Sequence, residues 1–250
     1  GSVGMAKPLD GAKITWKPGS LNYPTGIAVD SKGEVYVADF FNDSISVFSE
    51  KGEFLRRFPD PYKPTGRGGS GAGGGGIAVT AVAVSGDKVY ATDAYQVVVF
   101  SAQGELLNQF GRPGPGPDGL DHPNGIAVDK QGRIYVSDSN QSRVTAFSPE
   151  GTVLWTLGTP IKSLTEESNN PFILPRGLTV LGDGSLLVAD PLAHALVRLS
   201  SEGKVLANYG DRGEAPGQLN FPNAVAARDS LILVTDKEND RVQVVRLVGP

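Results

Sequence analysis

Short apolar runs separated by polar turns recur along the whole chain. In the clearest stretch, apolar segments at 26–30 and 34–39 are joined by a Gly turn. They are followed by a polar loop, a third segment at 45–49, a second Gly turn and a fourth segment at 53–58. Runs of this length predict β-strands, and the lack of strict apolar–polar alternation indicates strands that are covered on both faces.

This order of four segments returns in five copies, at 21–58, 80–111, 123–158, 175–210 and 222–247. An acid closes the second segment of each copy, and these acids are Asp39, Asp93, Asp138, Asp190 and Asp236. A repeat of four short strands is typical of a β-propeller blade. We therefore expect an all-β fold, a propeller of five four-stranded antiparallel blades.

The fifth copy stops after its third segment, and a candidate for its missing strand lies at the other end of the chain. Residues 13–16 precede the first copy in the setting that a fourth strand has elsewhere. We predict that this N-terminal strand pairs with the last blade and closes the ring. Residues 1–11 are interpreted as a tag or disordered segment, since Gly1-Ser2 looks like a cloning remnant, and residues 12–250 as one domain.

A family motif follows the second strand of several copies. Residues 236–244 resemble the NHL-repeat pattern Asp-x-x-Asn-His-Arg-Ile-Gln-Val, with looser copies at 39–45 and 138–144. His194 occupies the His position of the fourth copy, and the Pro-x-Gly start of the repeat is also similar to NHL. The resemblance spans 21–247 and implies an interaction platform or sensor module. NHL propellers usually have six blades, so six is the alternative to the five counted.

Composition narrows the function classes. The net charge of −4 argues against a nucleic-acid surface. The chain has no cysteine, which excludes disulfides and thiolate metal sites. No apolar stretch approaches the ~18 residues of a membrane span, so we expect no direct membrane insertion. We predict an extracytoplasmic domain of a bacterial protein, in the periplasm or at the cell surface.

Candidate catalytic and metal-binding residues are few. His122 and His194 stand at different stations of different repeats, so each is interpreted as a surface or loop-packing residue rather than a zinc ligand. The repeated acids are interpreted as caps of the backbone N–H groups in the following loop. The Gly-rich run at 66–76 lacks the Lys-Ser/Thr end of a phosphate loop and is interpreted as a flexible loop.

A column of residues just before each first strand is the candidate site. In a propeller the first strand lines the central tunnel, so these residues should surround one mouth: Thr25, Thr80, Asn124, Arg176 and Asn223. Arg176 could grip a carboxylate or phosphate in a fork, or pair with a nearby acid. We also expect the variable loops to cluster at this mouth, at 59–79, 111–122, 158–174 and 210–221. Phe40 and Phe41 are interpreted as a partner contact or as packing beneath their loop.

These observations favour a non-catalytic scaffold or sensor that binds a protein or small ligand through one tunnel mouth. No cofactor and no enzymatic activity are expected, because repetition of the acids gives no asymmetric catalytic set. The alternative that the resemblance implies is a divalent-metal-dependent lyase or lactonase with its metal in the tunnel. A structural Ca²⁺ held by Asp, Asn and Glu is a further alternative. RNA binding is the third alternative. The excess of 27 Asp and Glu over 23 Lys and Arg argues against it.

Overall fold

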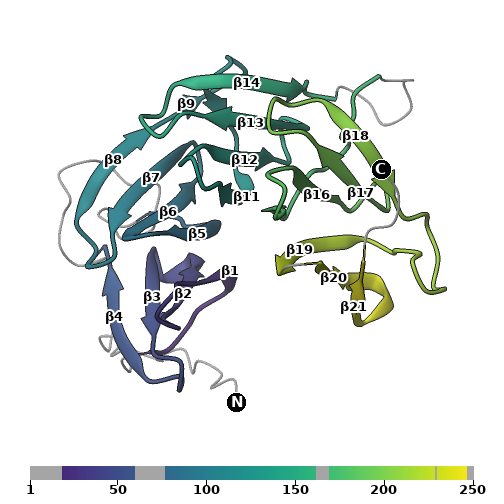
Figure 1. Cartoon of the computed structure of the whole chain (residues 1–250). Coiled ribbons are helices and arrows are strands. Elements are labelled where there is room, and N and C mark those ends of the chain that lie inside the picture. The colour runs from purple at the N-terminus through teal and green to yellow at the C-terminus, as the bar shows by residue number, and fades with distance from the viewer. Residues whose placement is uncertain (1–18, 60–76, 162–168, 229, 247–250) are drawn as a thin grey trace, which may run out of the picture.

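The molecule is a ring of β-sheets around a central axis (Figure 1). The computed structural model describes residues 19–59, 77–161, 169–228 and 230–246. Four sheets have four antiparallel strands in sequence order, and the described part of a fifth has three. The prediction of an all-β, five-bladed propeller is confirmed.

The blades follow the copies of the repeat closely. Blade 1 consists of β1 (Pro24–Val29), β2 (Val35–Asp39), β3 (Ser44–Phe48) and β4 (Phe54–Phe58). Blade 2 consists of β5 (Ala81–Ser85), β6 (Lys88–Asp93), β7 (Gln96–Ser101) and β8 (Leu106–Phe110). Blade 3 consists of β11 (Pro123–Val128), β12 (Ile134–Asp138), β13 (Arg143–Phe147) and β14 (Val153–Gly158).

The second half of the ring is built in the same way. Blade 4 consists of β15 (Leu178–Val180), β16 (Leu186–Asp190), β17 (Ala195–Leu199) and β18 (Val205–Tyr209). Blade 5 has β19 (Pro222–Arg228), β20 (Leu231–Asp236) and β21 (Arg241–Val245). The 3-10 turns η1 (Phe40–Asn42) and η2 (Lys237–Asn239) follow β2 and β20. A short parallel pair, β9 (Arg112–Pro113) and β10 (Gly119–Leu120), lies between blades 2 and 3.

Within the described ranges, buried side chains form four clusters, each between two successive blades. On β6, Val89 and Ala91 belong to the cluster shared with blade 1, whereas Tyr90 belongs to the cluster shared with blade 3. Alternate side chains of one strand therefore enter different cores. This explains why the inner strands are apolar without alternation.

An aromatic side chain from the outer strand of blades 1, 2 and 3 packs on the last hairpin of the next blade. The rings of Phe58 and Phe100 lie 5.3 Å apart, and those of Phe110 and Phe147 lie 5.1 Å apart. The hairpin glycine makes this contact possible: a Cβ on Gly104 would lie 2.6 Å from the Cβ of Phe58. Its φ of +93° also favours glycine.

The first and last blades differ from the others on one face. The predicted closing strand at 13–16 falls outside the described residues. The continuous run Leu231–Val234 predicts burial on both faces, yet Leu233 is 41% exposed while Val234 is buried. On blade 1, Ile27 is 69% exposed. Among the described residues the exposed aliphatic side chains of these two faces are Ile27, Val29, Leu231, Leu233, Val242 and Val244.

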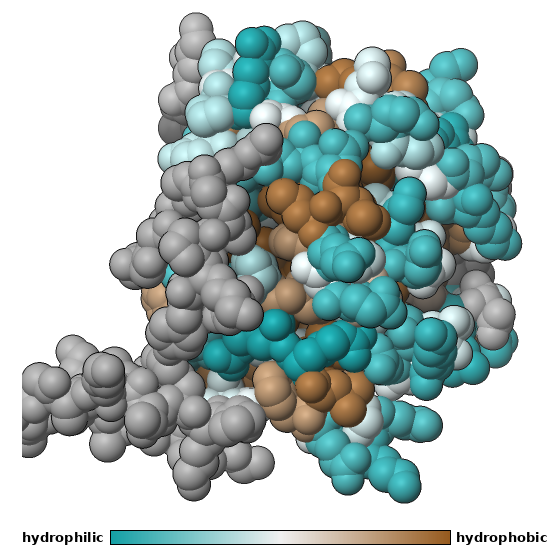
Figure 2. Space-filling view, turned by 90° about the vertical axis from the view of Figure 1, so that its left-hand side faces the viewer, coloured by the Kyte–Doolittle hydropathy of each residue, from teal (hydrophilic) through white to brown (hydrophobic). Residues whose placement is uncertain are grey.

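The outer strands meet water, as their mixed sequences predict. Figure 2 views the side of the ring where β4 and β8 lie, and it shows small apolar patches separated by hydrophilic surface. Leu55, Leu106 and Leu107 are partly exposed on these two strands. Scattered apolar groups of this kind are ordinary on a protein surface.

Candidate functional site

A β-bulge delivers the candidate residues to the tunnel mouth. In blade 1, Pro24 pairs with Asp39 and Gly26 with Ala38, so Thr25 is left between the two pairs. The same register shift leaves Asn124 and Asn223 unpaired at the start of β11 and β19. A bulge turns its extra side chain out of the ladder. The proline that begins each of these strands, followed by one variable residue and then Gly or Ala, is therefore the local signal that aims these residues.

The structure brings all five predicted mouth residues together in one cavity of about 460 Å³. Such a volume lies within the ~300–1,000 Å³ that is usual for ligand pockets. The column residues of all five blades contribute, which is the arrangement expected of a tunnel mouth. The remaining lining residues are Tyr23, Pro24, Phe40, His122, Gly177 and Ala224.

Arg176 is the one permanent cation among the lining residues. Its Nη1 donates a hydrogen bond to Asn223 Oδ1 at 3.1 Å, across the boundary between blades 4 and 5. Its Nε is buried and has no hydrogen-bond acceptor within the described residues. A buried donor without an acceptor costs about 1–3 kcal/mol. A small rotation that brings the guanidinium onto an anionic ligand would recover this free energy.

The polar groups of blades 1 to 3 have their hydrogens engaged with protein. The hydroxyl of Thr25 donates to Val79 O at 3.1 Å, and that of Thr80 donates to Pro123 O. Asn124 Nδ2 donates to His122 O at 3.0 Å and to Ser139 Oγ at 2.9 Å. Their oxygens keep lone pairs that can accept from a ligand. The mouth therefore has an accepting side on blades 1 to 3 and a donating side around Arg176.

His122 lies in the wall of this cavity, although the sequence indicated only a surface or loop-packing residue. Its backbone is left-handed, with φ of +54°. Its Nδ1 lies 2.8 Å from Asp121 Oδ1, and its ring lies 5.3 Å from that of Tyr95. One sequence signal could have indicated this place. His122 directly precedes the proline that begins β11, just as Tyr23 precedes the proline that begins β1.

Three aromatic rings gather beside the mouth on blade 1. The ring centroid of Phe41 lies 5.2 Å from that of Tyr23 and 5.1 Å from that of Phe40. Tyr23 is 64% exposed and Phe41 is 58% exposed, whereas Phe40 is half-buried and lines the cavity. Tyr23 has a φ of +59°, which is costly for a bulky residue. Tyr23, Phe40 and Phe41 are called the aromatic cluster below.

The repeated acids are buried, and several of them hold the loop that leads into the first strand of their own blade. Asp39 accepts from the N–H of Asn22 at 2.6 Å, and Asp236 accepts from the N–H of Asn220 at 2.6 Å. From the sequence we expected the acids to contact the loop that follows them. One such contact is present, since the Gln141 N–H donates to Asp138 at 3.1 Å. The acids thus fix the backbone that carries Tyr23, His122 and Phe221.

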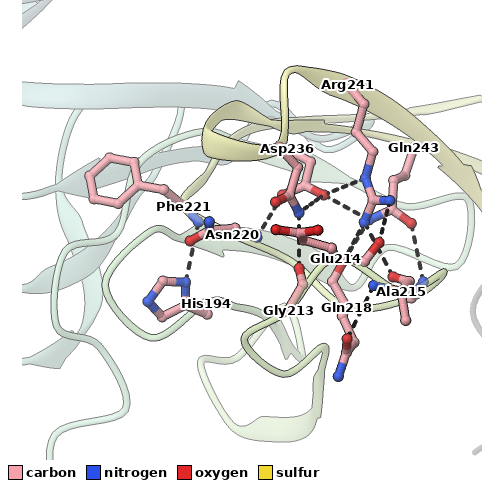
Figure 3. A network of polar contacts seen from close by, with 12 residues as sticks. His194, Gly213, Glu214, Ala215, Gln218, Asn220, Phe221, Asp236, Arg241 and Gln243 are labelled. Atoms are coloured by element: carbon pink, nitrogen blue, oxygen red, sulfur yellow. Dashed lines mark hydrogen bonds and ion pairs between the residues drawn. The ribbon is translucent and has the colours of Figure 1, made fainter.

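The surroundings of these acids set their pKa values in opposite directions. Burial raises the pKa of Asp138 to about 6, because two backbone N–H groups offset the loss of water only in part. Burial acts in the same sense on Asp236. There, hydrogen bonds from the Asn220 N–H and from three side chains outweigh it and hold the pKa below its ordinary value. The three side chains are those of Asn239, Arg241 and Gln243, the last two of which are labelled in Figure 3.

Two of the variable loops are fixed over their blades by arginines. Arg241 Nη1 donates to Glu214 O at 2.6 Å, and its Nη2 donates to the carbonyls of Ala215 and Gln218 (Figure 3). Arg143 makes equivalent contacts to the carbonyls of Pro115, Gly116 and Gly119. We expected these loops to surround the mouth. Of their described residues, only His122 lines the cavity. Loops 59–79 and 158–174 are described only in part, and the Gly run 66–76 falls outside the described residues.

His194 lies elsewhere. Its Nδ1 accepts a hydrogen bond from the N–H of Phe221 at 3.3 Å, which joins blade 4 to the loop leading into blade 5 (Figure 3). Through this contact His194 holds the backbone of the loop before β19. His194 does not line the cavity.

The residues of the mouth do not fit a zinc-type metal centre. His122 is the only imidazole in the lining, and the Arg176 guanidinium repels a cation. Across the described ranges, no three His, Asp or Glu residues gather in a way that could hold a metal ion. At the other end of the tunnel a cavity of about 380 Å³ contains Asp129 and Asp183, each 2.6 Å from an arginine nitrogen.

Comparison with known proteins supports the repeat assignment. The NHL-repeat family model matches residues 21–48 and 120–147. NHL repeat-containing protein 3 of Mus musculus is 30% identical over 203 residues, covering 74% of this chain and 55% of that protein. Protein brain tumor of Drosophila melanogaster is 28% identical over 142 residues, covering 56% of this chain and 13% of that protein. The chain thus spans between about one eighth and about half of these relatives' lengths.

Solved structures share the fold at low identity. A nidogen/laminin complex matches with a TM-score of 0.65 and 20% identity, covering 90% of this chain and 76% of that chain. A catalytically inactive virginiamycin B lyase from Staphylococcus aureus with quinupristin matches with a TM-score of 0.60 and 18% identity, covering 91% of this chain and 71% of that chain. No described helix is long and apolar enough to cross a membrane.

Proposed function

The chain is an NHL-repeat β-propeller, and we propose that it is a non-catalytic binding module whose partner places an anionic group on Arg176. The observation that carries this proposal is the mouth itself. One cavity collects the column residues of five blades, contains a single permanent cation and has no carboxylate in its lining. A lone guanidinium in such a setting selects for carboxylate or phosphate oxygens.

Family membership alone does not choose between binding and catalysis. Relatives at similar identity include a peptidyl-glycine alpha-amidating monooxygenase of Mus musculus, 28% identical over 132 residues, covering 48% of this chain and 13% of that protein. Binding is favoured by the chemistry of the mouth. Its lining contains one imidazole, that of His122, and no carboxylate or lysine that could serve beside it as a second acid or base.

The proposal can be tested without knowing the natural partner. A random peptide library displayed on phage is selected on the folded protein, and the enriched clones are measured against two variants. Arg176→Gln removes the cation from the mouth. Leu106→Ser removes an exposed apolar side chain from the outer strand of blade 2 and serves as the matched control.

We expect the enriched clones to lose about tenfold or more in affinity for Arg176→Gln, since a charge-assisted hydrogen bond contributes about 1.5–3 kcal/mol. Binding to Leu106→Ser should be unchanged. Clones that bind Arg176→Gln as tightly as the unchanged protein would remove the mouth as the site. The extracytoplasmic location stays a prediction.

A further inference from the structure

We infer that the partner is an extended peptide that places an acidic side chain on Arg176 and an aromatic or proline side chain on the aromatic cluster. This inference rests on the proposed function, because it takes the mouth as the binding site. It adds the chemical class of the partner and a second contact outside the cavity.

The division of hydrogen-bonding groups favours a peptide over a bare anion. Arg176 donates on one side of the cavity, whereas the oxygens of Thr25 and Asn124 can accept on the other, and Thr80, which already lies against the Thr92 hydroxyl, keeps one further lone pair. An anion without hydrogen-bond donors of its own satisfies only the donating side. A peptide carries both a carboxylate for Arg176 and backbone N–H groups for the accepting oxygens.

The aromatic cluster supplies an apolar contact next to the same cavity. Phe40 and Tyr23 line the cavity, and Phe41 continues the ring surface outside it. More than half of Phe41 and of Tyr23 remains exposed to water. A ring stacked on these two side chains buries apolar area and gains the geometry-dependent attraction between aromatic groups.

Charge argues against a nucleic acid as this partner. The lining contains one arginine and no lysine, and the whole chain carries a net charge of −4. Single-stranded RNA also stacks on aromatic rings, but its backbone requires a groove with several cations. The combination of one cation, several acceptors and three rings fits a peptide.

The probes are fluorescein-labelled peptides, acetylated and amidated at their ends, in which Glu and Phe are separated by zero to three glycines. Each has two partners, one with Gln for Glu and one with Ala for Phe. Anisotropy titrations compare the unchanged protein with Arg176→Gln, Phe41→Ser and the control Leu106→Ser. A fluorescein-labelled oligo-uridine strand tests the nucleic-acid alternative.

We expect at least one spacing to bind about tenfold more tightly than its Gln and Ala partners. Arg176→Gln should abolish the preference for Glu over Gln, and Phe41→Ser should abolish the preference for Phe over Ala. Leu106→Ser should change neither. This crossed pattern distinguishes two contacts on one ligand from general loss of folding.

Two results overturn the inference and leave the proposed function standing. In the first, Glu is preferred through Arg176 but Phe41→Ser has no effect. In the second, the oligo-uridine binds more tightly than every peptide and depends on Arg176. If no peptide of this series binds, the inference fails. If Arg176→Gln changes no affinity in either assay, the inference and the proposed function both fail.

Discussion

Replacing the hairpin glycine of blade 2 with alanine tests how the blades are packed together. Gly104 and Gly52 occupy the same turn in blades 2 and 1, with φ of +93° and +81°. A Cβ on Gly104 would lie 2.6 Å from both the Cβ and the Cγ of Phe58, whereas among described residues nothing lies within 4 Å of a Cβ on Gly52. Gly52→Ala is therefore a matched control for the same backbone change.

The two substitutions should differ by the cost of the clash. A left-handed conformation costs a residue with a Cβ about 1–2 kcal/mol, which applies to both variants. Gly104→Ala adds overpacking of about 1–3 kcal/mol. Rotation of the Phe58 ring cannot relieve it, because the Phe58 Cβ is attached directly to the backbone. We expect losses of about 1–2 kcal/mol for Gly52→Ala and about 2–5 kcal/mol for Gly104→Ala.

Urea unfolding followed by tryptophan fluorescence measures both losses, with equal slopes required for a valid comparison. In thermal unfolding each kcal/mol corresponds to about 2–4 °C for a chain of this size. Equal losses for the two variants would refute the reasoning. A large loss for both would mean that a side chain covers Gly52 in solution, and a small loss for both would mean that Phe58 does not pack on Gly104.

Three further predictions concern single side chains. The pKa of Asp138 is raised from 3.8 to about 6, so the stability associated with its neutral form is present below about pH 4 and is lost as the pH rises to about 6. In Asp138→Asn the urea midpoint should therefore depend less on pH over that window. The same dependence on pH in the variant and the unchanged protein would contradict the assignment. Arg241→Ala should cost about 2–3 kcal/mol, since it removes one donor to the carboxylate of buried Asp236 and one donor to each of three loop carbonyls; a loss below about 0.5 kcal/mol would show that the loop holds without it. Val234→Thr should cost about 1–2 kcal/mol because it buries a hydroxyl, whereas Val244→Thr, 61% exposed, should stay within about 0.5 kcal/mol; equal losses would mean that this face of blade 5 is covered in solution.

The strands and the mouth could be predicted because their determinants are local and repeated. A Pro-x-Gly start, or Pro-x-Ala in blade 5, coincides with the bulge that carries Thr25, Asn124 and Asn223, and this signal recurs in blades 1, 3 and 5. Apolar runs of fixed order locate the strands, since a blade needs apolar side chains on both faces. Because the pattern occurs in five copies, the assignment of the strands does not depend on any one ambiguous position.

Properties that depend on a neighbouring blade could not be predicted in this way. The run Leu231–Val234 has the composition of a strand covered on both faces, yet the exposure of Leu233 depends on what lies opposite and is not encoded in that run. The left-handed backbone of His122 recurs at Tyr23 and Phe221, directly before the same proline, but the sequence pattern does not show which of these side chains enters the cavity wall. Whether Arg176 pairs with an acid depends on side chains from three blades.

The hydrogen bond between Arg176 and Asn223 links occupancy of the mouth to retention of the last blade. Blade 5 has one apolar cluster, on its blade 4 side, within the described residues. The Nη1 contact and the bond from Gly177 N–H to Asn223 O join the innermost strands across this same boundary. A partner that orders the guanidinium thus also favours the docked blade. By thermodynamic reciprocity, loosening that blade weakens the partner's affinity by the same factor.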